Sequence, residues 1–166
     1  MSTAEIEDEL RKLHLSSVWS DSIASRLAAL SRFEKYPEHH ILFREGDVAR
    51  DAYLVCHGQV ALDMSAPGRK TARILTVGRG ELLAWSPLVG EPRLSATATT
   101  LTPTQLIVFS GPDLLKLCAA EPAIGYPVMQ RLSWAMARRL TATRLQLMDL
   151  YAHTTPQLLI TAGEQP

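Results

Sequence analysis

The feature that most constrains the fold is a series of short apolar bursts between residues 41 and 80. Typical bursts are 41–43, 52–55 and 60–62, and glycines or a Pro-Gly pair separate them. Bursts this short and this closely spaced are typical of an antiparallel sandwich or roll. Two further strands are predicted at 95–101 and 105–109, with Pro103 between them. The sequence therefore predicts a mainly β protein, an antiparallel β-roll or jelly-roll.

Helical patterns flank this region. Ser2 and Glu5 form a capping-box pattern ahead of apolar residues at helical spacing, and a second helix is predicted from Asp21. Helical character returns at Pro112, a residue type that suits the first turn of a helix. The strands are therefore predicted to have short helices on both sides in sequence.

A long final helix is predicted over residues 128–151, after Pro122 and Pro127. Its apolar residues recur at alternating spacings of three and four, which is the seam of a coiled coil. The seam is Met129, Leu132, Met136, Leu140, Thr143, Leu147 and Leu150. A helix packed only on its own roll is the alternative, and Trp134 on another face shows that packing within the chain also matters. We expect the helix to serve both purposes and the protein to be a homodimer.

These patterns divide the chain into consecutive parts. The parts are an N-terminal helical segment (1–31), a β-roll (32–110) with a central segment (80–99), C-terminal helices (111–152) that include the dimer helix (128–151), and a tail (153–166).

Composition excludes several classes of function. Lys plus Arg equals Asp plus Glu at 17 each, so the chain lacks the basic excess that nucleic-acid binding needs. Cys56 and Cys118 lie in apolar surroundings without a paired thiol, which indicates small buried side chains in a reducing compartment. The acidic, polar N-terminus is unlike a signal peptide, and no apolar run reaches membrane-spanning length. We expect a cytoplasmic protein without nucleic-acid or membrane partners.

The segment 80–99 has the residues needed to hold a small anion. Gly80 and Gly90 permit positive φ angles and close approach of backbone amides to a ligand. Arg93 can present a planar guanidinium to a phosphate, and Glu81 can accept from a sugar hydroxyl. The alternative is an ordinary turn in which Arg93 is a solvated surface charge.

These features together resemble the cyclic-nucleotide-binding domain of catabolite activator protein-like effectors. The resemblance covers about residues 33–151, and the helix at 131–140 looks like the dimerisation helix of that family. The matching pieces are Ile41-Leu42-Phe43-Arg44-Glu45-Gly46-Asp47, Ala52-Tyr53-Leu54-Val55, Gly58-Gln59-Val60, Gly80-Glu81-Leu82, and Arg93 with Ser95-Ala96.

The resemblance implies a ligand site and its chemistry. In the family, amides of the Gly-Glu-Leu turn and an arginine followed by a small pair hold the cyclic phosphate. The glutamate binds the ribose, and a threonine on the long helix meets the base. The corresponding residues here are Gly80, Glu81, Leu82, Arg93, Ser95, Ala96 and Thr143. The implied ligand is cyclic AMP or another cyclic nucleotide, with no cofactor.

The sequence departs from the family pattern at four places. The spacing from Gly80 to Arg93 is longer than in the usual cassette. Leu94 stands between Arg93 and the small pair, so either Arg93 or Leu94 occupies the phosphate position. The loop contains Trp85-Ser86, a sequence that resembles domains that have lost or changed their nucleotide. Arg144 replaces the small hydroxyl residue that follows the threonine in the activators.

Two functions remain open at this point. One is a ligand-sensing module that passes a signal to its last helices and to a partner protein, and the other is a dimeric interaction module with an emptied pocket. An inward-pointing Arg93 favours the first, and a solvent-facing Arg93 favours the second. The DNA-binding module of the family would need more residues after the long helix than the fifteen or so present here.

An enzyme is not expected, because the chain lacks the residue groupings that catalysis needs. The five histidines are scattered, so we expect no metal site. The chain has neither a nucleophile elbow nor a P-loop. No catalytic residue is therefore assigned.

Overall fold

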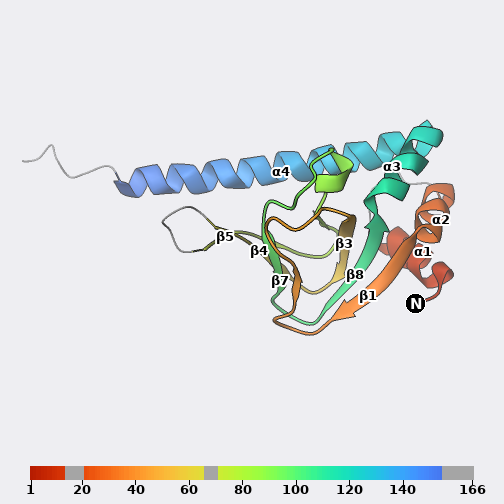
Figure 1. Cartoon of the computed structure of the whole chain (residues 1–166), viewed down its shortest axis with the longest axis horizontal. Helices are drawn as coiled ribbons and strands as arrows, with labels where there is room; N and C mark the ends of the chain where they lie inside the picture. Colours follow the sequence, from red (N-terminus) through yellow and green to blue (C-terminus); the bar gives the residue numbers. More distant parts are fainter. Residues whose placement is uncertain (14–20, 66–70, 155–166) are drawn as a thin grey trace, which may run out of the picture.

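The computed structural model describes residues 1–13, 21–65 and 71–154, with side chains described to residue 148. Within these residues two helices precede a set of short strands, and two helices follow it (Figure 1). The helices are α1 (Thr3–Lys12), α2 (Asp21–Ala29), α3 (Gly111–Ala120) and α4 (Pro122–Thr154), with a short 3-10 helix η1 (Ser86–Leu88). The strands are β1 (Ser31–Tyr36), β2 (Ile41–Phe43), β3 (Asp51–His57), β4 (Val60–Met64), β5 (Ala72–Val77), β6 (Leu82–Leu83), β7 (Thr97–Thr100) and β8 (Thr104–Ser110).

The strands form two four-stranded sheets that pack face to face. One sheet has the order β1-β8-β3-β6 and the other β2-β7-β4-β5, and the neighbouring strands of the described residues pair antiparallel. The antiparallel roll predicted from the apolar bursts is therefore confirmed. The predicted break at Pro103 is also present, since β7 ends at Thr100 and β8 begins at Thr104.

The core has two layers because successive residues of a strand point to opposite faces. In β3, Leu54 and Cys56 pack against the helices, whereas Val55 packs between the two sheets. Because β3 is covered on both faces, its sequence is apolar almost throughout. Burial raises the pKa of the Cys56 thiol to about 12, so this buried thiol stays protonated.

The N-terminal helices follow the sequence prediction. The Ser2 side chain accepts a hydrogen bond from the Glu5 backbone, and the Glu5 carboxylate accepts one from the Ser2 backbone at 2.6 Å. This capping box satisfies N–H groups that otherwise lack partners at a helix start. Ile6 and Leu10 then face the core beside α2.

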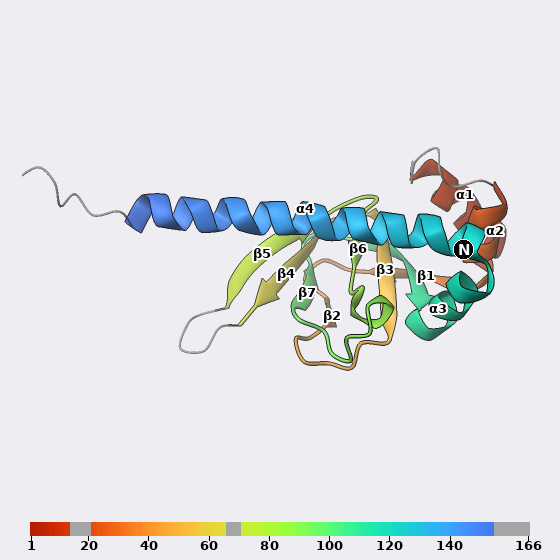
Figure 2. The same cartoon turned by 90° about the horizontal axis from the view of Figure 1, so that it is seen from above.

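The long helix α4 crosses the whole roll, and Figure 2 shows it lying over β3 and β6 with β4 and β5 beneath its C-terminal part. It begins at Pro122, earlier than the predicted start at residue 128, and Pro127 lies inside it. Pro127 is the sixth residue of the helix, so its missing N–H removes one intrahelical hydrogen bond, to the Ala123 carbonyl. At the other end, the Gln146 side chain donates to the Ile74 carbonyl at 2.8 Å, which ties α4 to β5.

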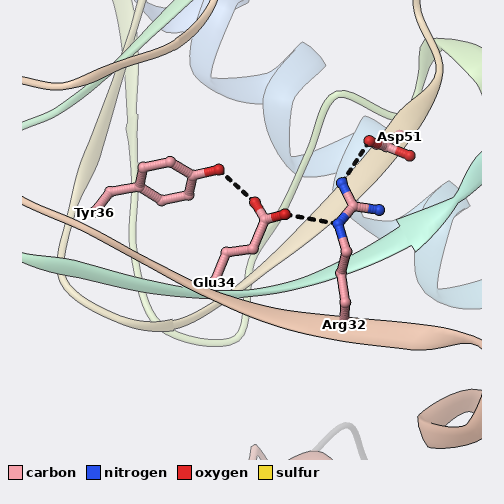
Figure 3. Close-up of polar contacts among 4 residues, drawn as sticks. All are labelled: Arg32, Glu34, Tyr36 and Asp51. Atoms are coloured by element: carbon pink, nitrogen blue, oxygen red, sulfur yellow. Dashed lines mark hydrogen bonds and ion pairs between the residues drawn. The ribbon is translucent and has the colours of Figure 1, made fainter.

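The edge strand β1 was not among the strands predicted, because it carries few apolar residues. Its polar residues form a cluster with β3 (Figure 3): Arg32 donates to Glu34 at 2.6 Å and to Asp51 at 2.7 Å, and Tyr36 donates to Glu34. Hydrogen bonding by Asp51 raises the pKa of Arg32. Strand β1 is thus specified by backbone pairing to β8 and by this cluster, neither of which appears in an apolar pattern.

Some predicted features lie outside the described residues. These are the Pro67-Gly68 turn, most of the tail predicted from residue 153, and the side chain of Leu150 in the helix seam.

Candidate functional site

The Gly80-Glu81-Leu82 turn is fixed against β3 and faces α4. Gly80 has a φ of +78°, a left-handed conformation that favours glycine. Its N–H donates to the Val55 carbonyl at 2.8 Å, and the Val55 N–H donates to the Glu81 carbonyl at 3.0 Å. The backbone then runs through β6 to Trp85 and η1. This arrangement presents the Gly80 carbonyl and the Glu81 side chain to the long helix.

Three arginines on α4 reach toward this turn. Arg131 donates to the Gly80 carbonyl at 2.6 Å, Arg138 lies 3.3 Å from the Glu81 carboxylate, and the Arg139 guanidinium lies 3.9 Å from the centre of the Trp85 ring. Positions separated by seven and eight residues fall on one face of a helix. The straight path of α4 over the turn therefore brings all three guanidinium groups to one place.

Glu81 already has a partner for each carboxylate oxygen. Its Oε2 accepts from the Gly78 backbone N–H at 2.8 Å, and its Oε1 faces Arg138 at 3.3 Å. A sugar hydroxyl that bound Glu81, as the family resemblance implies, would share these oxygens with Gly78 and Arg138.

Arg139 is the least compensated of the three cations. Among the described residues, no carboxylate lies within 4.0 Å of its nitrogens, and its Nε is buried without a hydrogen-bond partner. Burial lowers its pKa to about 10, although Glu81 opposes the shift. The side chain is still charged at neutral pH. A buried N–H without an acceptor costs free energy.

Trp134 separates the other two arginines. The Arg131 and Arg138 guanidinium carbons lie 4.8 and 5.0 Å from the centre of its ring. The ring is half exposed beside the turn. Cation–π contacts of this kind hold long arginine side chains in place at modest energy.

Two cavities meet at the Trp85–Arg139 contact. The larger, about 80 Å³, lies between the turn and α4, and the smaller, about 20 Å³, lies between η1 and the start of β7. The larger cavity is lined by Leu75, Val77, Gly80, Glu81, Leu82, Trp85, Arg131, Trp134, Ala135, Arg138, Arg139 and Ala142. Trp85 and Arg139 line both cavities, so they divide one elongated space.

The structure brings five of the seven predicted ligand residues to these cavities. Gly80, Glu81 and Leu82 line the larger cavity. Ser95 and Ala96 line the smaller one. Whether they contact a ligand stays a prediction.

Arg93 lies elsewhere. Its side chain is exposed and donates to the Gly46 carbonyl at 2.7 Å, and its backbone bridges to Val48. Leu94 is buried instead, with 7% exposed, and lines the smaller cavity beside Ser95. Of the two residues that the sequence left open for the phosphate position, Leu94 is therefore the one that lines a cavity. The predicted phosphate contact of Arg93 would require its side chain to leave this position.

Thr143 lies near the cavities without lining them. Its hydroxyl donates to the Arg139 carbonyl at 3.0 Å, one turn earlier in the same helix. The hydroxyl is therefore used within α4, and its predicted contact with a base stays a prediction.

Sequence reasoning missed the α4 arginines and the two tryptophans as site residues. Arg131, Arg138 and Arg139 were assigned only to a dimer helix. Their spacing along one face was visible in the sequence, but nothing in it said that this face covers the Gly80 turn rather than solvent.

Two further findings limit the kind of site. Among the described residues, no group of three or more His, Cys, Asp or Glu side chains could hold a metal ion. No helix in the described part of the chain is long and apolar enough to cross a membrane. The cytoplasmic location expected from the sequence stays a prediction.

Comparison with known proteins identifies the family. Residues 33–121 match the cyclic nucleotide-binding domain, which is more than half of the chain. The chain belongs to the cyclic nucleotide-binding domain family. The resemblance identified from the sequence is confirmed, and the antiparallel roll with its long C-terminal helix is the fold of this family.

A curated relative and two solved structures show the extent of the likeness. The cyclic AMP receptor protein of Thermus thermophilus is 31% identical over 121 residues, which cover 72% of this chain and 54% of that protein. A cyclic nucleotide-binding domain from Methylobacillus flagellatus superimposes with a TM-score of 0.77 at 23% identity, covering 95% of this chain and 86% of that one. The catabolite activator protein of Thermus thermophilus gives a TM-score of 0.67 at 26% identity, covering 82% and 62%. The chain spans about half the length of the cyclic AMP receptor protein of Thermus thermophilus.

Proposed function

We propose that this domain is a regulatory sensing module that binds a cyclic nucleotide or a related small phosphate-bearing anion beneath α4. The observation that carries this proposal is Arg139. It is a charged guanidinium at the meeting point of two cavities, with a buried Nε that has no partner among the described residues. An anion bound there would supply the missing acceptor, and charge-assisted hydrogen bonds of this type are among the strong ones.

In this proposal the cationic side chain that binds the phosphate belongs to the helix α4 and not to the 80–99 segment. Arg139 replaces Arg93 in function, while Ser95 and Ala96 provide the small wall opposite it. Gly80 and Leu82 form the floor of the larger cavity, where the rest of the ligand would lie.

Cavity size links binding to movement of α4. The larger cavity has about 80 Å³, and an apolar cavity of roughly 150 Å³ holds only a benzene-sized molecule. A nucleotide therefore fits only if Arg139 leaves Trp85 or α4 shifts away from the turn. A ligand that binds the shifted state more tightly would change the population of α4 positions, which is how a sensing module transmits a signal.

Calorimetry of the purified domain against cyclic AMP and cyclic GMP tests the proposal. Arg139→Gln should weaken whichever ligand binds by at least about tenfold, the loss expected for one charge-assisted contact. The matched control is Arg93→Gln, because Arg93 is exposed and bonded to Gly46. An equal loss in both variants, or a larger loss in the control, would return the phosphate contact to Arg93.

A nucleotide-free interaction module is the second candidate, and the position of Arg93 favours it. A solvent-facing Arg93 is the feature expected of such a module, and Arg93 is exposed. The use of both Glu81 oxygens within the protein points the same way. Absence of heat from any nucleotide, together with stable self-association, would support this candidate over the first.

A homodimer through α4 is proposed with either function. Met136, Leu140 and Leu147 of the predicted seam are 41%, 52% and 49% exposed, and a stripe of this kind is normally covered in a soluble protein. Leu140→Glu combined with Leu147→Glu should give folded monomers by sedimentation. Leu145→Glu is the control, since Leu145 is equally exposed but lies on another face. A monomeric unmutated domain would rule the interface out.

A further inference from the structure

The larger cavity carries an unusual balance of charge. Within the described part of the chain, its ionisable lining residues are Glu81, Arg131, Arg138 and Arg139. One carboxylate faces three guanidinium groups, so two positive charges are left uncompensated. Arg131 donates a hydrogen bond to the Gly80 carbonyl, which is a neutral acceptor. Arg139 has no acceptor at its Nε among the described residues.

Ligands of this family's general type differ in charge. A cyclic nucleotide has a phosphodiester with a single negative charge, which would leave one arginine of the site uncompensated. A phosphomonoester carries between 1.5 and 2 negative charges near pH 7 and presents three oxygens, because its second pKa is about 6. Arginine binds such a group through its planar fork of donors.

We infer that this site prefers a dianionic phosphomonoester, such as a nucleoside monophosphate, to a cyclic nucleotide. The inference rests on the proposed function and names the ligand class of the same site. Arg139 would hold one edge of the phosphate, and the free donors of Arg131 or Arg138 would hold another. The dianion would complete the charge balance that the protein leaves open.

The two cavities, of about 80 Å³ and about 20 Å³, are small, so they can hold the phosphate group of a ligand and not its nucleoside. Size is therefore the same for both ligand classes, and charge is what distinguishes them. The Trp85–Arg139 contact is where such a group would enter, because both residues line both spaces.

The test is calorimetry with adenosine 5′-monophosphate and cyclic AMP, which share a nucleoside and differ in phosphate charge. At pH 7.5 the monophosphate should bind at least tenfold more tightly. At pH 5.5 its affinity should fall about fourfold, because only about a quarter of a phosphate with a second pKa near 6 is then dianionic. Arg139, whose pKa is about 10, stays charged over this range, and Glu81 faces both ligands alike.

Variants separate the charge effect from general damage. Arg139→Gln should bring the ratio of the two affinities close to one, whereas Arg139→Lys, which keeps the charge, should keep the preference. Arg144→Gln is the matched control, because Arg144 lies on α4, is exposed and lines neither cavity. Loss of the preference in Arg144→Gln would contradict the assignment to this site.

The outcomes distinguish this inference from the proposed function. Cyclic AMP that binds as tightly as the monophosphate at pH 7.5 overturns the dianion preference and leaves the sensing function standing. Tighter binding of a cyclic dinucleotide, which carries its two charges on two phosphodiesters, also overturns the phosphomonoester assignment. Binding of none of the three ligands overturns both proposals.

Discussion

Arg32 on the edge strand and Arg139 on the long helix are arginines in opposite situations. Arg32 bonds two carboxylates, Glu34 and Asp51, on a well-exposed part of the roll (Figure 3). Arg139 stacks on Trp85, and among the described residues no carboxylate lies within 4.0 Å of its guanidinium nitrogens. The partners of Arg32 raise its pKa, whereas burial lowers the pKa of Arg139 to about 10.

This difference has a thermodynamic meaning. A raised pKa on a base means that the folded state favours the charged form, and a lowered pKa means that folding disfavours it. The β1 cluster is therefore a structural device that stabilises the roll. Burial of the charged form of Arg139 is a cost to the folded protein, and the proposed ligand role would account for it.

The largest effect should come from ligand protection. At a free ligand concentration one hundred times the dissociation constant, the unmutated domain and Arg32→Met should each gain about 2.7 kcal/mol of unfolding free energy. Arg139→Met should gain only about 1.4 kcal/mol or less at the same ligand concentration, since its site binds at least tenfold more weakly. Thermal unfolding with and without the tightest nucleotide measures this. Equal protection of all three proteins would erase the distinction between the two arginines.

The next largest effect concerns the stability that the β1 cluster gives to the ligand-free protein. Arg32→Met leaves Glu34 and Asp51 without their cation, so the free energy of unfolding should fall by about 1 kcal/mol, a value reduced because Arg32 is about half exposed. Urea unfolding of the ligand-free protein checks this. A change of less than about 0.5 kcal/mol, the usual range for surface substitutions, would show that the cluster does not stabilise the protein measurably.

The same substitution at Arg139 should raise the free energy of unfolding or leave it unchanged. Methionine keeps an apolar stem against Trp85 and removes a buried charge, so the ligand-free protein should become more stable by up to about 1 kcal/mol. Urea unfolding beside Arg32→Met makes the comparison direct. Strong destabilisation would show that Arg139 is a structural residue after all.

The smallest effect should be a change in how protein stability depends on pH. Although burial opposes it, hydrogen bonds from Tyr36 and Arg32 lower the pKa of Glu34. A carboxylate whose folded pKa is lowered stabilises the protein above its unfolded pKa, near 4.3, and that stability is lost as pH falls below it. Between pH 5.5 and 3.5 the unmutated domain should therefore lose more stability than Glu34→Gln. The exposed Glu91→Gln serves as control, and identical acid profiles for all three would contradict the role of Glu34.

The sequence alone determined the fold because the fold depends on local patterns. Short apolar bursts between glycines predict antiparallel strands, Ser2 and Glu5 predict a capped helix, and a long apolar seam predicts α4. Each of these features depends on residues within a few positions of one another, and each is present in the structure. The strand β1 was missed because its partners in β3 and β8 are far away in the sequence.

Only the tertiary structure decided which cation faces the cavity. The sequence placed Arg93 beside Ser95, yet the bridge to Val48 turns Arg93 outward and buries Leu94. Arg139 is more than fifty residues from the Gly80 turn and reaches it only because α4 crosses the roll at that point. The direction of a side chain in a bent segment, and the contact between a helix and a distant turn, depend on packing across the whole domain. A linear pattern does not contain that information.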